Sequence, residues 1–137
     1  MTLSIESLTV RYGETTAVDD VSLSITAGDV LALVGPSGCG KSTLLRTIAG
    51  LVVPADGKVI WQGRDITQVP THQRGIGLMF QDHALFSHRS VADNIGFGLK
   101  MAGVDSAGRT ARTEELLALV GLEGFGPRSV EGLSGGE

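Results

Sequence analysis

The sequence predicts an α/β fold, and three observations carry that prediction. Residues 30–34 are apolar without alternation and are bounded by Gly35-Pro36, which is typical of a central, parallel strand covered on both faces. Segments with alternating polarity precede this run, and a segment with helical periodicity follows it directly. Strands followed by a central strand and a helix form an α/β arrangement.

Two amphipathic strands are expected before the central one. Residues 3–10 alternate apolar with polar side chains, and the phase slips at Glu6 and Ser7, which predicts a strand with a β-bulge. Residues 21–25 alternate cleanly until Ala27-Gly28-Asp29 breaks the pattern. The second segment therefore predicts a half-exposed strand.

A helix and two short strands are expected next. Residues 41–51 contain no helix breaker until Gly50, and their apolar stripe consists of Leu44, Leu45 and Ile48. That spacing predicts a helix. Residues 57–61 and 76–80 read as short strands separated by a polar stretch.

The chain changes from strand-rich to helix-rich near Gln81. Ser90 and Asp93 have the spacing of a helix start, which predicts a helix to Met101 weakened by its two glycines. A second helix is expected over residues 107–122, closed by Gly124. Its predicted apolar side consists of Leu116, Leu117 and Val120.

Composition limits the classes of function. The length of 137 residues suits one domain, and the net charge of -4 lacks the basic excess that nucleic-acid binding favours. A single cysteine permits no intrachain disulfide, which suits a reducing compartment. The apolar run at 30–34 is far shorter than the ~20 residues that span a bilayer. Any role at a membrane is therefore expected to come through a partner.

Residues 35–42 match the phosphate-loop pattern G-x-x-x-x-G-K-[ST], between the predicted strand and helix. Backbone amides of such a loop, together with the positive end of the helix, hold phosphate oxygens. Lys41 is expected to reach the β and γ phosphates, Ser42 to coordinate Mg²⁺ and Thr43 to donate to the α phosphate. The predicted nucleotide-binding residues here are Gly35, Pro36, Ser37, Gly38, Cys39, Gly40, Lys41, Ser42 and Thr43. Cys39 is interpreted as a small spacer rather than a redox switch.

Other classes of site find less support. A GTPase needs an Asn-Lys-x-Asp element, yet Asn94 is the only Asn and is followed by Ile95. A nucleotide kinase stays open on the loop alone. The spacings of His72, His83 and His88 do not suit one helical face, so we expect no metal site made of histidines.

The last five residues, Leu133-Ser134-Gly135-Gly136-Glu137, resemble the signature Leu-Ser-Gly-Gly-Gln of ATP-binding cassette (ABC) proteins. Residues 78–86 and 91–95 are similar to bacterial ATPases that import iron, polyamines, sugars or other small solutes. This resemblance spans the chain. It implies a P-loop NTPase core with an N-terminal antiparallel β subdomain, in a partial ABC ATP-binding domain whose strand-rich, nucleotide-binding part is residues 1–80. It also implies that residues 81–137 hold the Q-loop and the start of an α-helical subdomain, truncated before the Walker B strand.

The resemblance also implies roles for individual residues. Tyr12 would stack on adenine, and Gln81 would approach Mg²⁺ and act with Lys41 in catalysis. The signature residues that would bind ATP held by a second, head-to-tail copy are Ser134, Gly135 and Gly136. The implied partners are transmembrane permease subunits, with His83 near their coupling helix, and an extracytoplasmic solute-binding protein. The implied location is the cytoplasmic face of a bacterial membrane.

Two residues depart from the family pattern. Ser87 stands where many such importers have Pro, and Glu137 replaces the usual signature Gln. A carboxylate near phosphates is unfavourable unless water screens it. Weakened or retuned closure of the shared site is therefore one expectation.

The chain lacks the expected hydrolytic residues. It contains no Asp-Glu dipeptide, and the resemblance implies that a Walker B strand, a catalytic Glu and a switch His should follow. We therefore expect the full-length subunit to hydrolyse ATP and this chain alone to be inactive. The alternative is a truncated nucleotide-binding or interaction fragment without turnover. An ABC protein acting on ribosomes or DNA is disfavoured by the acidic composition. Without further strands, the apolar segments 30–34 and 76–80 are expected to be exposed.

Overall fold

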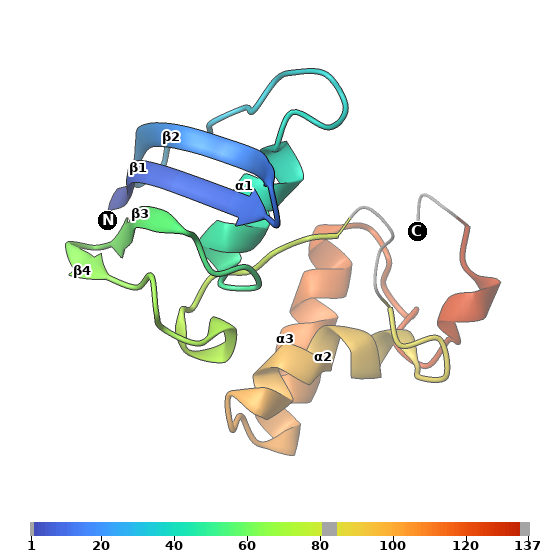
Figure 1. The fold of residues 1–137 in the computed structure, drawn as a ribbon. Coiled ribbons are helices and arrows are strands. Elements are labelled where there is room, and N and C mark those ends of the chain that lie inside the picture. The colour runs from blue at the N-terminus through green and yellow to red at the C-terminus, as the bar shows by residue number, and fades with distance from the viewer. Residues whose placement is uncertain (1, 81–84, 135–137) are drawn as a thin grey trace. The chain divides into compact units, whose positions relative to one another are not determined.

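The computed structural model describes residues 2–80 and 85–134. The chain divides into two compact units, Met1–Met79 and Phe80–Glu137, and each is described by itself. The first unit contains β1 (Thr2–Tyr12), β2 (Thr15–Thr26), α1 (Lys41–Ala49), β3 (Asp56–Trp61), β4 (Arg64–Asp65) and a short 3-10 helix (Thr71–Gln73) (Figure 1). The second contains α2 (Val91–Met101), α3 (Ser106–Leu119) and a 3-10 turn (Val130–Gly132).

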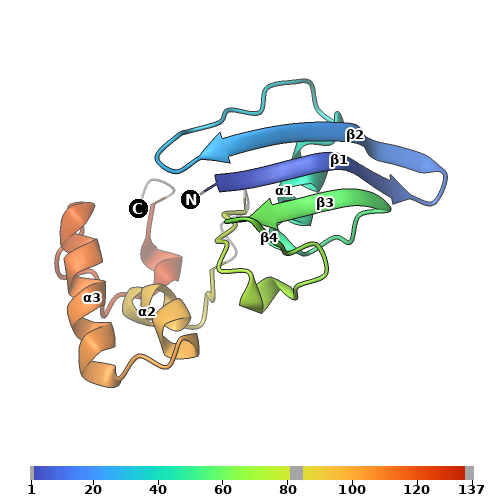
Figure 2. The same cartoon turned by 90° about the vertical axis from the view of Figure 1, so that its left-hand side faces the viewer.

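The strands of the first unit form one antiparallel sheet in the order β2-β1-β3-β4 (Figure 2). The β1 register shifts between Ile5 and Leu8, where Ser7 has φ 46° and its N–H donates to Ser22 Oγ at 2.8 Å. Ile5 and Leu8 would point to opposite faces of a regular strand, and the irregularity lets both be buried. The predicted bulge is therefore confirmed, together with strands around residues 3–10, 21–25 and 57–61.

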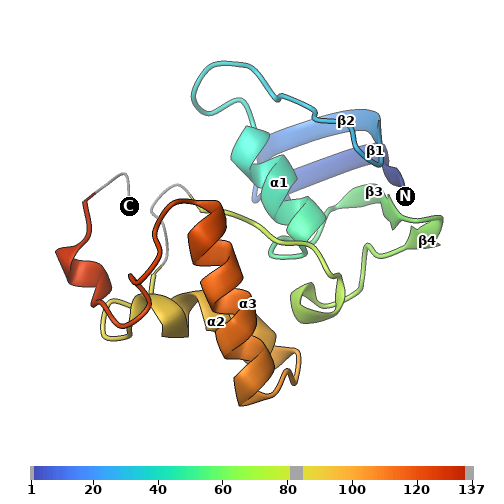
Figure 3. The same ribbon diagram turned by 180° about the vertical axis from the view of Figure 1, so that it is seen from behind.

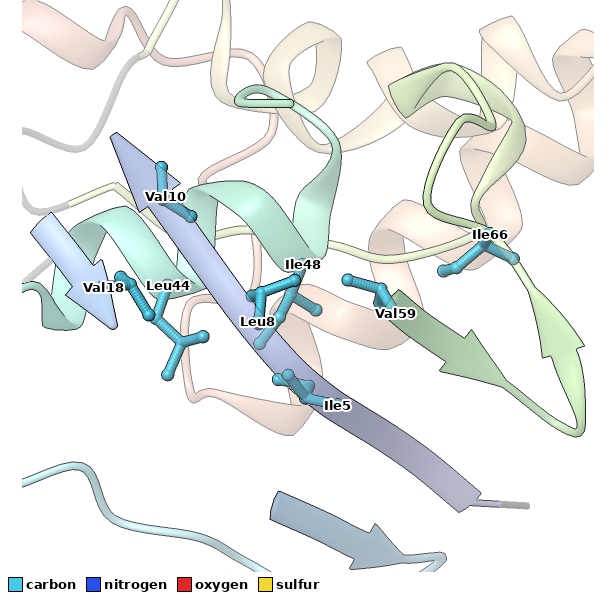
Figure 4. Close-up of a cluster of buried hydrophobic side chains, with 8 residues drawn as sticks. All are labelled: Ile5, Leu8, Val10, Val18, Leu44, Ile48, Val59 and Ile66. Atoms are coloured by element: carbon cyan, nitrogen blue, oxygen red, sulfur yellow. The ribbon is translucent and has the colours of Figure 1, made fainter. Parts of the chain in front are cut away.

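Helix α1 covers one face of this sheet (Figure 3). Leu44 and Ile48 lie one helical turn apart, so both reach the sheet from the same side of the helix. The buried cluster that results consists of Ile5, Leu8, Val10, Val18, Leu44, Ile48, Val59 and Ile66 (Figure 4). This cluster fixes α1, and with it the loop that precedes α1, against the strands.

The C-terminal end of α1 is set by Gly50. Its φ is 83°, and its N–H donates to Thr47 O at 3.0 Å, while Leu51 N–H donates to Arg46 O at 2.9 Å. Glycine adopts this left-handed conformation without the penalty that a side chain would bring. The helix therefore ends at Ala49, two residues before the predicted end.

Two strand predictions are wrong. Residues 30–34 and 76–80 belong to no strand. A β-strand requires a paired neighbour, and no strand in the part of the chain that the structure describes pairs with either segment. Their predicted exposure is observed: Val30, Val34 and Met79 are 96%, 92% and 94% exposed.

The second unit is helical, as predicted. Ser90 caps α2, since its Oγ accepts from Asp93 N–H at 3.1 Å and donates to the Asp93 carboxylate at 2.8 Å. Helix α3 begins after Asp105, whose carboxylate accepts from Gly108 N–H at 2.8 Å. Both helix starts therefore have side-chain caps, which satisfy amides that lack intrahelical partners.

Helix α3 ends earlier than expected. The helix stops at Leu119, and Gly121, with φ 73°, follows it before the predicted stop at Gly124. Leu117 is buried, but Val120 lies beyond the helix and is 64% exposed. The predicted apolar stripe is therefore wrong at Val120, because the helical geometry that would align it has already ended.

A helix that crosses a bilayer must be long and apolar. Over the ranges 2–80 and 85–134, no helix combines the length and the apolar character that this needs.

Candidate nucleotide site

The phosphate loop lies on an exposed turn that leads directly into α1. Gly40, with φ 89°, is the residue before the helix. A Cβ at this position would collide with the Ala17 carbonyl and approach Val18 Cγ2 at 3.4 Å. The position therefore requires glycine both for its left-handed backbone and for the close approach of β2.

The first turn of α1 presents amides that no described side chain caps. The hydrogen bond from Leu44 N–H to Gly40 O, at 2.8 Å, opens the helix, so the amides of Lys41, Ser42 and Thr43 precede the helical ladder. The first turn also carries no acidic side chain. The positive end of the helix dipole is therefore left available to an anion.

Lys41 folds over the loop that precedes it. Its Nζ donates to Gly35 O at 2.7 Å, to Pro36 O at 2.6 Å and to Cys39 Sγ at 3.3 Å. Among the side chains that the structure describes, the ion pair that forms is Arg112 with Glu115. The Lys41 charge is therefore held by carbonyl and thiol dipoles, and it pairs with no carboxylate of residues 2–80 and 85–134.

The other side chains of the loop and of the first helical turn differ in their exposure. Cys39 is exposed, and a Cβ at Gly35 would lie 2.8 Å from its sulfur, so the loop is tightly folded. Ser42 is exposed on the first helical turn, and Thr43 is half-buried. Thr47 Oγ1 donates to Thr43 O at 2.8 Å, one turn further along the helix.

Tyr12 is linked to the loop through β2. It pairs with Thr15 across the β1–β2 hairpin and is 50% exposed. Ala17, two residues further along β2, is the residue that packs against Gly40. One strand therefore connects the predicted adenine-stacking residue with the predicted phosphate loop.

The remaining predicted site residues lie elsewhere. Ser134 is described, is exposed and belongs to the second unit. Gln81, Gly135 and Gly136 lie outside the described residues, as do His83 and Glu137. Across the described ranges, no three His, Cys, Asp or Glu side chains gather as a metal site.

Sequence reasoning missed Arg74. This side chain is only 5% exposed, and burial lowers the pKa of its guanidinium. It contacts the C-terminal end of the helix that begins at Lys41. Its position in a polar stretch after Pro70 gave no signal, since no apolar periodicity marks a buried arginine.

A cavity of about 750 Å³ lies in the second unit, away from the phosphate loop in sequence. Helices α2 and α3 form it with the segment that follows α3. Its polar lining includes the side chains of Arg89, Asp93, Lys100, Arg109 and Glu114. The candidate nucleotide site is therefore an open loop rather than this cavity.

The chain is similar to known proteins in sequence and in fold. The model of the ABC transporter family matches residues 18–137. The Fe(3+) ions import ATP-binding protein FbpC of Streptomyces coelicolor is 53% identical over 135 residues, which cover 98% of this chain and 39% of that protein. The sulfate/thiosulfate import ATP-binding protein CysA of Gloeobacter violaceus is 47% identical over 137 residues, or 100% of this chain and 40% of that protein. The chain thus spans about two fifths of the length of these curated relatives.

A solved structure has the same fold. The dimeric ATP-binding cassette MJ0796, in a post-hydrolysis state bound to ADP and Pi, superimposes with a TM-score of 0.84 at 28% identity. That match covers 98% of this chain and 64% of the other. By its family match, its relatives and its fold, this chain belongs to the ABC transporter family.

Proposed function

We propose that this chain is the ATP-binding part of an ABC importer subunit, which couples ATP binding and hydrolysis to solute transport. The observation that carries the proposal is the uncapped first turn of α1 next to the Lys41 ammonium. Anions bind such helix starts because several amides and the helix dipole converge on them. In this proposal residues 1–80 form the nucleotide-binding part, and residues 81–137 hold the Q-loop and the helical subdomain.

Each predicted side chain has a role in this site. Lys41 leaves the carbonyls of the loop and pairs with the β and γ phosphates, which offer full negative charge in place of dipoles. Ser42 supplies a hydroxyl to Mg²⁺, and Tyr12 stacks on the adenine. Gln81 approaches Mg²⁺ and contributes, with Lys41, to phosphoryl transfer. Mg²⁺ supplies charge neutralisation at the phosphates when bound.

Calorimetric titration with Mg-ATP tests the nucleotide site. Lys41→Ala is expected to weaken binding about 10- to 100-fold, as for loss of charge-assisted hydrogen bonds. The matched control is Lys58→Ala, which removes an exposed lysine on β3 and should leave affinity unchanged. Equal binding by Lys41→Ala and the parent would reject the assignment of the loop.

The proposed subunit works with partners. The relatives named for ferric iron and for sulfate or thiosulfate match this chain at 53% and 47% identity, so the proposal is for solute import and assigns no solute. Transmembrane permease subunits and an extracytoplasmic solute-binding protein complete the transporter, which places the subunit at the cytoplasmic face of a bacterial membrane. The cysteine of a Ser87→Cys variant should cross-link to a permease in cells that carry the whole transporter.

A second copy is proposed to complete the ATP site. Ser134, Gly135 and Gly136 of one copy would offer a hydroxyl and backbone amides to ATP held by Lys41 of the other. In a subunit of the relatives' length, Ser134→Trp is expected to leave ATP binding intact and to abolish ATP-dependent dimerisation, measured by light scattering. Dimerisation equal to that of the parent would reject the shared site.

Turnover is proposed to need residues beyond those of this chain. Phosphoryl transfer depends on positioning water and neutralising developing charge, and the chain contains no Asp-Glu dipeptide to do so. The 137-residue chain is expected to bind Mg-ATP without releasing phosphate. Phosphate release that disappears with Lys41→Ala would contradict this expectation.

A further inference from the structure

Arg74 is a buried cation in the first unit, with 5% of its surface exposed. Among the described residues, its guanidinium donates to four main-chain carbonyls. Nε donates to Val69 O at 2.7 Å, and Nη2 donates to Thr67 O at 2.7 Å. Nη1 donates to Thr47 O at 3.0 Å and to Ile48 O at 2.9 Å. A buried guanidinium needs such partners, because an unpaired charge in the interior is costly.

These carbonyls belong to two different segments. Thr47 and Ile48 lie in the last turn of α1, where carbonyls lack the usual partner four residues on, although Thr47 O also accepts from Gly50 N–H at 3.0 Å. Thr67 and Val69 lie in the connection that follows β4. The cation also sits at the negative end of the helix dipole, which stabilises it without a carboxylate. Arg74 therefore fastens the end of α1 to the β4 connection.

The contact leaves little room for rearrangement. A Cβ at Gly50 would collide with the Arg74 guanidinium. Thr71 Oγ1 adds a further link by donating to Gly50 O at 2.8 Å. The end of α1 is thus held from the side of Arg74 by side-chain hydrogen bonds and by close packing.

We infer that Arg74 is a positioning residue for the nucleotide site, acting through α1. The inference rests on the proposed ATP binding at the opposite end of this helix. Helix α1 has nine residues and packs against the sheet through Leu44 and Ile48. A short helix moves as a rigid body, so a shift at its last turn displaces the Gly40 and Lys41 amides at its first. Displacements of about 1 Å are enough to weaken a preorganised site strongly.

No other cationic side chain can reproduce the hydrogen bonds of the Arg74 guanidinium. Lysine keeps the charge, but its three donors share one nitrogen and cannot reach four carbonyls in two segments at once. Arg74→Lys is therefore the main variant, and Arg74→Gln, which removes the charge, is the second. The control is Ile5→Val, which loosens the same buried cluster from β1 without changing Arg74 or the residues whose carbonyls it binds.

Two measurements on the 137-residue chain test the inference. The first, without nucleotide, records the NMR amide shifts of residues 40–43 and the urea stability of each variant. The second titrates each variant with Mg-ATP. Arg74→Lys is expected to shift the amides of residues 40–43 and to weaken ATP binding about tenfold. Ile5→Val is expected to lower stability while leaving those amides and the affinity as in the parent.

The outcomes separate this inference from the proposed function. A parent chain that binds no ATP rejects the nucleotide site, while the amide shifts still decide whether Arg74 positions the loop. A folded Arg74→Lys chain with parental amide shifts and affinity overturns the inference. It is also overturned if the lysine and glutamine variants both fail to fold, because Arg74 then serves to fold the unit. The inference is also overturned if Ile5→Val weakens ATP binding too, so that the affinity of each variant simply follows its stability.

Discussion

The side-chain amide of Asn94 binds both the main-chain N–H and the main-chain carbonyl of Phe86. Asn94 Oδ1 accepts from Phe86 N–H at 2.8 Å, and Nδ2 donates to Phe86 O at 3.2 Å and to Ser90 O at 2.9 Å. The Phe86 ring lies 4.8 Å from that of Phe97, and the Arg89 guanidinium lies 4.8 Å from the centre of the Phe86 ring. The turn before α2 is therefore fixed to that helix by one amide side chain and one aromatic pair.

Removing the Asn94 amide should release this turn. Asn94→Ala is expected to cost about 1–3 kcal/mol, because hydrogen bonds that hold the Phe86 backbone are lost. Hydrogen exchange at the Phe86 amide should accelerate more than tenfold, which is about 1.4 kcal/mol. Lys100→Ala, an exposed change on the same helix, is the control. Unchanged exchange at Phe86 in Asn94→Ala would contradict the assignment.

The cap of α2 should be measurable by itself. Ser90→Ala removes the oxygen that accepts from Asp93 N–H, and a loss of about 1 kcal/mol in the free energy of unfolding is expected. Ser106→Ala is the comparison, since Ser106 is the first residue of α3 while Asp105 supplies the cap. Urea denaturation followed by circular dichroism gives both values. A loss as large in Ser106→Ala would show that capping is not the cause.

Thr67 should stabilise the β3–β4 region through its hydroxyl. The Oγ1 atom accepts from the buried Val59 N–H at 2.9 Å and donates to Asp65 Oδ1 at 2.6 Å. Thr67→Val keeps the shape but leaves the Val59 N–H unpaired, at an expected cost of about 1–3 kcal/mol. Thr67→Ser keeps the oxygen and should retain most of the stability. Denaturant unfolding of the two variants provides the test, and equal losses in both would reject the role of the hydroxyl.

The stability of this region should depend on pH through Asp65. Hydrogen bonds from the Thr67 side chain and backbone lower the pKa of the Asp65 carboxyl, with a smaller contribution from Lys58. A carboxyl with a lowered folded-state pKa adds stability above its unfolded pKa, about 3.9 for Asp, and loses it as pH falls through the folded value. The melting temperature should therefore fall as pH drops below about 4, and Asp65→Asn should reduce that dependence. An unaltered pH profile in Asp65→Asn would assign the dependence to other groups.

The exposed apolar segment before the phosphate loop should promote self-association. Val30 and Val34 are 96% and 92% exposed, in a stretch that belongs to no strand. Unpaired apolar segments of this kind are prone to pair between molecules. The double change Val30→Thr and Val34→Thr should reduce aggregate formation in light scattering. Leu119 and Val120 are also exposed but lie at the end of α3. Changing both of them to Thr should have little effect on aggregate formation. Equal reduction in both double variants would rule out strand pairing as the cause.

Local signals in the sequence predicted the elements that local chemistry controls. The slipped alternation at Glu6 and Ser7 predicted the bulge in β1, and the spacing of Ser90 and Asp93 predicted the cap of α2. The phosphate-loop pattern predicted a helix beginning at Lys41. These features depend on contacts within a few residues, so the sequence contains the necessary information.

Strand pairing decided the secondary structure of residues 30–34 and 76–80, which the local sequence pattern could not. Residues 30–34 and 76–80 have the apolar character of buried strands, but strand formation depends on a neighbouring backbone. That neighbour is a property of the assembled sheet, in which β1 lies between β2 and β3 among the described strands. The apolar pattern of these segments therefore predicted their secondary structure wrongly, because no described strand pairs with them.

The sequence by itself determined the start of α1 at Lys41, the cap of α2, the bulge in β1 and the resemblance that the family match confirmed. Only the tertiary structure decided that Lys41 folds onto the Gly35 and Pro36 carbonyls and that Arg74 closes the far end of α1. The physical reason is the range of the interactions. A cap or a bulge joins residues close in the chain, whereas Arg74 reaches carbonyls 26 and 27 residues away, which become its neighbours only after the sheet and α1 have packed.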